Sequence, residues 1–292
     1  MSASSPLFRF VQIEFPWPLG PPDGRYLVRP PGEAGAAPSH VIVFATLGAP
    51  ERRRLTGRRR VRDAPPEPDP TPVTTGRATI IATDEPLAGP DQARAWLEAA
   101  AEDGLAAGLR VLDRALHAFR LVTVDPYAQP VGRRQALIAR IGYGAGEQVA
   151  DGLWIEAREL APSDGRRRRR ASGAVLAPQA RLAAVLGARE LPLACEELAL
   201  RARLDLDHDR PREAALQLLV ALDATIAELS ADPRAAALAE RLAELRGRRD
   251  GVGTAAQAAL SGPLAPEQAE TVSLTLACVE GALRARAAAG SA

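Results

Sequence analysis

The sequence predicts an α+β protein, with an N-terminal antiparallel sheet covered by one long helix and an all-α helical bundle domain after it. In the first half of the chain, segments rich in β-branched and aromatic residues flank one long helical pattern. The second half contains only helical patterns, and an Arg-rich segment separates the two halves. The length of 292 residues also favours two domains over one.

The covering helix is predicted over residues 90–119. Pro90 suits a first helical turn, and Asp91 suits the positive end of the helix dipole. Gly104 and Gly108 each disfavour a helix by roughly 1 kcal/mol relative to Ala, unless a closely packed neighbour needs the space. One face of the segment is apolar at steps of three and four residues: Leu97, Ala101, Leu105, Leu109, Leu112, Leu116 and Phe119. An unbroken helix would be about 45 Å long, enough to brace a sheet.

Strands are predicted on both sides of this helix, and a β-meander is the simplest topology that connects them. The alternation in the first strand slips between Phe10 and Val11, which indicates a bulge or burial on both faces. The predicted strands are 7–15, 25–29, 40–47, 77–83, 121–124, 136–143 and 153–160.

The chain is predicted to contain two domains and a linker. Residues 1–162 form the α+β domain. It includes an Arg- and Pro-rich insertion, 51–75, that cannot bury a core and is expected to be disordered. Residues 163–173 contain five consecutive Arg residues and form an Arg-rich linker, and residues 174–292 form the α-helical domain.

The helical domain offers a candidate contact surface. Helices are predicted at 179–186, 193–206, 212–229, 233–246 and 266–286, with a flexible segment after the fourth. The helix 212–229 carries more apolar residues than one buried face of a helix needs. Leu216 and Val220, one turn apart, form a second apolar stripe on its surface. Either other helices of the bundle cover this stripe, or Leu216 and Val220 contact a partner chain.

The composition argues against several classes of protein. The net charge is +1, so the overall charge gives no reason to expect nucleic acid or a membrane as partner. All 37 basic residues are Arg. Cys195 and Cys278 are the only cysteines and form no CxxC pair, so no metal or other cofactor is expected. No signal-peptide or membrane-spanning pattern is present, which favours a cytoplasmic location.

Residues 198–229 read as two antiparallel helices joined at a Pro-containing turn. This segment resembles a tetratricopeptide-type hairpin, with Ala214 and Ala221 at its small-residue positions. The resemblance implies peptide binding or an interface with another protein. A generic helical hairpin fits the same residues, and no second unit follows at the expected period.

Arg203 and His208 carry a second resemblance. Their spacing is similar to the Arg-x4-His motif of HEPN-type ribonucleases, which implies action of both residues on a phosphodiester. His208, however, is predicted to lie in a turn, whereas that motif requires a helix. The neighbouring Asp205, Asp207 and Asp209 resemble the start of a calcium loop that lacks its Gly and Glu. Helix-capping carboxylates and a solvated His are the alternative interpretation.

Two further segments could contact phosphate. Gly142, Gly144 and Gly146 form a G-x-G-x-G pattern after a strand, which fits either a phosphate loop or a hairpin loop. The linker arginines could neutralise phosphates of a nucleic acid, or they could form a solvated linker. These arginines are Arg166, Arg167, Arg168, Arg169 and Arg170.

The sequence therefore predicts a non-catalytic cytoplasmic interaction or scaffold protein whose helical domain contacts a protein partner or a second copy of itself. A nucleic-acid-associated protein that uses its Arg-rich segments is the second hypothesis. A ribonuclease centred on Arg203 and His208 is the third.

Overall fold

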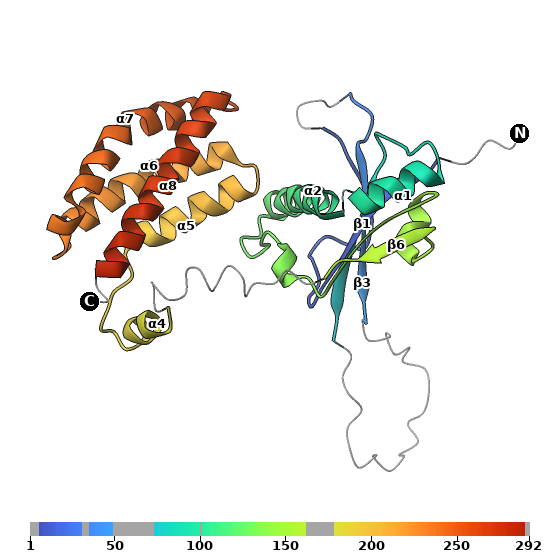
Figure 1. Ribbon diagram of the computed structural model, residues 1–292, viewed down its shortest axis with the longest axis horizontal. Coiled ribbons are helices and arrows are strands. Elements are labelled where there is room, and N and C mark those ends of the chain that lie inside the picture. The colour runs from blue at the N-terminus through green and yellow to red at the C-terminus, as the bar shows by residue number, and fades with distance from the viewer. Residues whose placement is uncertain (1–5, 31–34, 49–72, 100, 162–177, 290–292) are drawn as a thin grey trace, which may run out of the picture. The chain divides into compact units, whose positions relative to one another are not determined.

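The computed structural model describes residues 6–30, 35–48, 73–99, 101–161 and 178–289. The chain divides into two compact units, Met1–Ser163 and Asp164–Ala292 (Figure 1). The first unit combines strands and helices and the second is helical, so the predicted α+β class is confirmed. Most of the predicted insertion and the whole linker 163–173, including Arg166–Arg170, lie outside the described residues.

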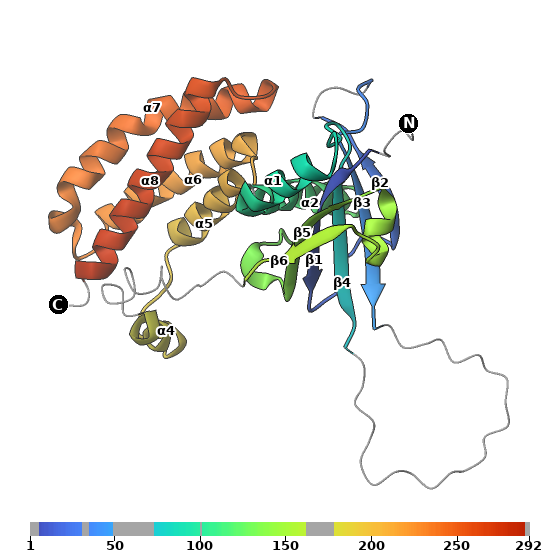
Figure 2. The same cartoon turned by 45° about the vertical axis from the view of Figure 1, so that its right-hand side comes forward.

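The first unit contains one antiparallel sheet, in the order β2-β3-β4-β1-β5-β6 (Figure 2). The described strands are β1 (Phe8–Phe15), β2 (Gly24–Val28), β3 (His40–Leu47), β4 (Thr75–Ala82), β5 (Ile138–Gly144) and β6 (Glu156–Glu159). Strands β2, β3 and β4 form a meander, but β1 is inserted between β4 and β5. The first strand of the chain is therefore central, and a simple meander is not the topology. Thr75, at the end of the predicted insertion, belongs to β4.

Strand β1 is buried on both faces, which explains the slip in its alternation. Val11 belongs to the main core, and its neighbour Phe10 belongs to a smaller cluster with Val41, Ile81 and Val149. The ring of Trp154 stacks on Phe10 with 5.6 Å between ring centres. The pairing of β1 with β5 runs without interruption from Phe8 to Glu14, so no bulge is needed.

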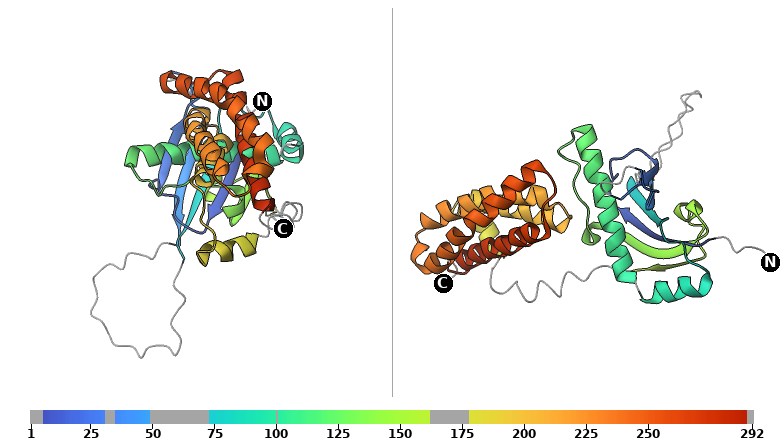
Figure 3. Two further views of the ribbon diagram at one scale, coloured as in Figure 1. Left: turned by 90° about the vertical axis from the view of Figure 1, so that its left-hand side faces the viewer. Right: turned by 90° about the horizontal axis from the view of Figure 1, so that it is seen from above.

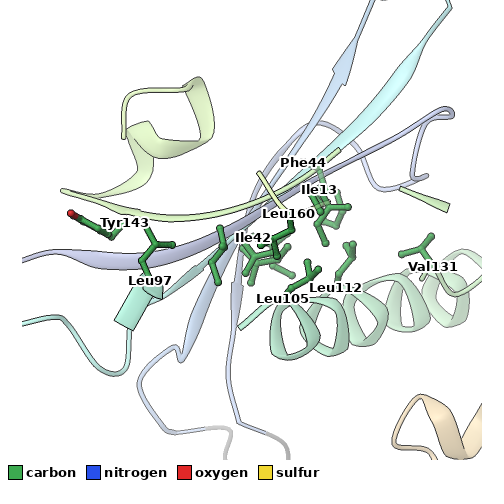
Figure 4. Packing of buried hydrophobic residues seen from close by; sticks show 14 of the residues in the cluster. Ile13, Ile42, Phe44, Leu97, Leu105, Leu112, Val131, Tyr143 and Leu160 are labelled. Carbon is green, nitrogen blue, oxygen red and sulfur yellow. The ribbon is translucent and has the colours of Figure 1, made fainter. Parts of the chain in front are cut away.

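Two helices, α1 (Pro90–Ala99) and α2 (Ala101–Thr123), occupy the place of the predicted covering helix. They run in different directions (Figure 3), which suits a twisted sheet better than one straight helix would. Leu105 and Leu112 of α2 pack towards Ile13, Ile42 and Phe44 of the sheet (Figure 4). The predicted strand 121–124 is wrong, because α2 continues through Thr123.

The second unit contains α4 (Pro178–Leu186), α5 (Ala194–Asp207), α6 (Pro211–Ser230), the short 3₁₀ helix η3 (Ala235–Leu238), α7 (Ala239–Ser261) and α8 (Pro266–Ala289). Helix α6 is central and packs against α5, α7 and α8. The flexible segment predicted at 247–253 is part of α7. Val252, Ala255 and Ala259 pack into the core, and this burial outweighs the low helix propensity of the glycines.

Candidate functional site

The second unit has an apolar groove between α4, α5 and α8. Its volume is about 580 Å³. Leu182 lines it from α4, Leu193 and Leu200 from the start and middle of α5, and Leu283 from α8. Charged side chains of α5 and α8 lie around these leucines: Glu196, Glu197, Glu280 and Arg284.

Two of these leucines are exposed in spite of their size. Leu182 keeps 58% and Leu200 keeps 66% of its surface accessible to solvent. Contiguous exposed apolar surface with a polar rim is typical of protein interaction sites. The groove is therefore the strongest candidate for a contact site in this unit.

Ion pairs fix the walls of the groove. Arg181 of α4 donates to Glu190 at 3.0 Å and to Glu196 of α5 at 2.6 Å. Arg286 of α8 lies 3.5 Å from Glu190 and 3.8 Å from Glu196. The hydrogen bond from Arg181 holds the pKa of Glu190 below its ordinary value. These contacts join α4, α5 and α8, so the groove is formed before any ligand arrives.

The N-terminus of α5 is capped by a side chain of α6. The Glu228 carboxylate accepts hydrogen bonds from the backbone N–H groups of Ala194, at 3.1 Å, and Cys195, at 3.0 Å. Burial, together with the neighbouring Glu228, raises the pKa of the Cys195 thiol to about 12. The thiol therefore stays protonated at neutral pH and cannot serve as a nucleophile.

The second stripe on α6 is exposed. Leu216 keeps 38% and Val220 keeps 55% of its surface accessible, whereas Leu218 and Leu222 on the same helix are fully buried. Of the two alternatives for this stripe, the described helices therefore do not provide the first, because they leave it largely uncovered. Neither residue lines the groove.

Arg203 and His208 have structural contacts. The Arg203 guanidinium binds both carboxylate oxygens of Glu280, at 2.7 and 3.1 Å, and so joins α5 to α8. The Nδ1 atom of His208 lies 2.7 Å from the Leu204 carbonyl oxygen at the end of α5. Asp205 pairs with Arg210 at 2.9 Å. The described residues contain no group of three or more His, Cys, Asp or Glu side chains that could hold a metal ion.

The glycines of the G-x-G-x-G pattern are explained by close packing at Gly142 and Gly144 and by backbone conformation at Gly146. A side chain at Gly142 would clash with the backbone of β6, and one at Gly144 would clash with Val149. Gly146 has φ of 149° and precedes the 3₁₀ helix η2 (Glu147–Asp151). Val149 in that helix is fully buried. The pattern therefore allows the loop to pack on the sheet, as a hairpin loop would.

Sequence reasoning missed the groove because its walls come from three separate helices. The sequence did contain one indication of the groove. Leu200 lies outside the apolar face that Cys195, Leu198, Ala202 and Leu206 form on the same helix. An outward-facing leucine alone is common, so only the packing of α4 beside α5 distinguishes it.

The chain thus combines an α+β unit with a helical unit that carries an apolar groove. No protein-family model, curated protein or solved structure matches it. In the part of the chain that the structure describes, no helix is long and apolar enough to cross a bilayer.

Proposed function

We propose that this chain is an interaction protein whose helical unit binds a partner protein in the groove between α4, α5 and α8. The observation that carries the proposal is the exposure of Leu182 and Leu200 on two helices that line one apolar groove. Burial of two leucine side chains gives about 1.5–3 kcal/mol each, which is a substantial part of a micromolar affinity.

The occupant with suitable chemistry is an amphipathic helix of the partner. The wall on α5 extends from Leu193 to Leu200, and the wall on α8 from Glu280 to Ala287, so each spans about two helical turns or roughly 11 Å. A partner helix of similar length would place apolar residues at positions i, i+3 and i+4 against this surface.

The charges around the groove are paired within the chain. Glu196 pairs with Arg181, Glu197 with Arg201 and Glu280 with Arg203. The rim therefore carries no excess of charge that would select the flanking residues of a partner, and the apolar spacing of the partner helix decides the fit.

Selection of helical peptides on the intact chain tests this proposal. A phage-displayed library of amphipathic helical peptides should yield binders with the apolar spacing described above. The double substitution Leu182→Glu/Leu200→Glu should weaken their binding at least about tenfold, equivalent to roughly 1.4 kcal/mol. Leu274→Glu is the matched control, since Leu274 lies on α8, is 53% exposed and does not line the groove. Absence of enriched peptides, or equal weakening by the control, would overturn the proposal.

The other two hypotheses have less support. The nucleic-acid hypothesis rests on Arg-rich segments that lie outside the described residues. The ribonuclease hypothesis rests on Arg203 and His208, and a phosphodiester would have to displace Glu280 from Arg203. We therefore advance the interaction role alone.

A further inference from the structure

Two ionisable residues occupy positions on the apolar, helix-covered face of the sheet in the first unit. In β1, Arg9 lies on the same face of the strand as Val11, Ile13 and Phe15, and these three residues belong to the main core. In β3, His40 precedes Ile42 and Phe44 in the same alternation. A charged residue in such a position needs a partner or a polar cavity.

The sheet register brings these two residues to the same level. His40 is the Cα partner of Ala82 in β4, and Phe10 is the partner of Ile81. Continuing this register by one residue pairs Arg9 in β1 with Ala82, on the side of β4 opposite to β3. Arg9 and His40 thus flank the small side chain of Ala82 on the two strands next to β4.

A cavity of about 210 Å³ lies above this row of residues, between the sheet and helices α1 and α2. Small residues of α2 leave the space open: Gly104, Ala107 and Gly108 line the cavity together with Trp96 of α1. Asp84, just after β4, also lines it and is exposed to solvent. The volume is below the roughly 300–1,000 Å³ of sites for drug-sized ligands, so the ligand would be smaller.

Arg9 has an unused donor. Its Nη2 atom binds the Glu85 carboxylate at 3.0 Å, and its guanidinium carbon lies 6.0 Å from the centre of the Trp96 ring. Its Nε atom is buried and has no hydrogen-bond acceptor within the described part of the chain. Solvent does not reach Nε, but Arg9 lines the cavity, so a ligand there would meet the terminal nitrogens of the guanidinium.

His40 supplies an acceptor. Burial lowers the pKa of His40 below its ordinary value, against the opposing effect of Asp84, so the ring is neutral at pH 7. Its Nδ1 atom lies 3.0 Å from the Ser39 hydroxyl, which itself donates to the Val28 carbonyl oxygen at 3.3 Å. The proton of the neutral ring therefore resides on Nδ1, and Nε2 carries a free lone pair.

We propose that this cavity binds a small zwitterion of amino-acid size. The carboxylate of the ligand pairs with the Arg9 guanidinium, and its ammonium group donates to the Asp84 carboxylate and to His40 Nε2. An apolar side chain of the ligand lies against Val11 and Ile80, which also line the cavity. The site lies wholly in the first unit, so it does not depend on the groove in the helical unit.

Isothermal titration calorimetry on the intact chain tests this inference, with the twenty standard amino acids as probes. At least one amino acid should bind with a Kd below about 1 mM. Its N-acetyl form, which lacks the ammonium, and its amide form, which lacks the carboxylate, should each bind at least about tenfold more weakly. Equal binding of all three forms, or no binding by any of the twenty, would overturn the proposal.

Substitutions locate the site. Arg9→Met and Asp84→Asn should each weaken binding at least about tenfold, while Arg94→Met should leave it unchanged. Arg94 lies on α1 two residues before Trp96 and does not line the cavity. Asp84 is exposed, so Asp84→Asn keeps the test valid even if Arg9→Met fails to fold. Binding that survives both site substitutions would contradict the assignment.

Discussion

At the scale of single residues, Asp232 holds the end of α6 to α8. Its carboxylate accepts from Arg234 Nε at 2.7 Å and from Arg286 Nε at 2.7 Å. Only 5% of the Asp232 side chain and 6% of the Arg286 side chain are accessible. Arg286 also lies 3.5 Å from Glu190 and 3.8 Å from Glu196, so loss of the Asp232 charge removes its shortest ion pair but leaves two others.

Asp232→Asn should lower the free energy of unfolding by about 1–3 kcal/mol, because buried hydrogen bonds to a charged group are weakened. The control is Asp223→Asn, which breaks the exposed pair between Asp223 and Arg249 and should lower it by less than about 1 kcal/mol. Urea unfolding followed by circular dichroism measures both values. Equal losses in the two variants would show that burial of the pair contributes nothing.

The same pair gives a pH dependence with a defined sign. The hydrogen bond from Arg234 is the largest cause that holds the pKa of Asp232 well below its ordinary value. A lowered pKa in the folded state means that the stabilisation is present above the unfolded-state pKa of about 4 and is lost as the pH falls below it. Wild-type protein should lose more stability than Asp232→Asn between about pH 5 and pH 3.

At the scale of elements, two glycines in helices have opposite roles. A Cβ atom at Gly108 in α2 would lie 2.9 Å from the Val11 Cβ atom in β1, so this glycine permits close contact between helix and sheet. Gly253 in α7 has no neighbour within 4 Å of such an atom. Gly108 is therefore required for packing, whereas Gly253 only lowers helix propensity.

Gly108→Ala should lower the free energy of unfolding by about 1–3 kcal/mol, because Val11 is buried and has little room to move. Gly253→Ala should raise it by about 0.5–1 kcal/mol through helix propensity. Thermal unfolding of the two variants beside wild type provides the measurement. A stabilising Gly108→Ala would mean that α2 does not approach the sheet as closely as described.

Local sequence patterns predicted the existence of the helices and strands well. They predicted the ends of these elements and the pairing of the strands less well. The apolar periodicity of 212–229 predicted α6 closely, because a buried central helix carries a strong repeating signal. The segment 247–253 was predicted to be flexible from its glycines and charges, yet Val252 anchors it in α7. The central place of β1 depends on pairing with residues far along the chain, and no local signal reveals it.

Both candidate sites were missed for related reasons. The groove and the cavity each need elements that are distant in sequence, so neither has a motif of its own. Arg9 and His40 did carry a signal, because each interrupts an apolar alternation on a strand. The sequence could not show that these two residues lie on either side of Ala82.

At the scale of the whole molecule, the exposed stripe of Leu216 and Val220 offers a second surface for association. Two copies that met through these faces would commonly form a two-fold symmetric dimer. Light scattering on the intact chain should then report a dimer, and Leu216→Glu/Val220→Glu, with its folding checked by circular dichroism, should be a monomer. A monomeric wild-type protein, or a double variant that still dimerises, would exclude this stripe as a self-interface.

If the groove between α4, α5 and α8 contacts a partner protein, photo-crosslinking in cells that express the intact chain should detect it, with p-benzoylphenylalanine placed at Leu200 and, as control, at Leu274. Both positions are exposed, at 66% and 53%, but only Leu200 lines the groove. We predict a crosslink from position 200 to an amphipathic helix of one dominant partner, and no such crosslink from position 274. Equal crosslinking from both positions, or none from position 200, would show that the groove is not the contact surface.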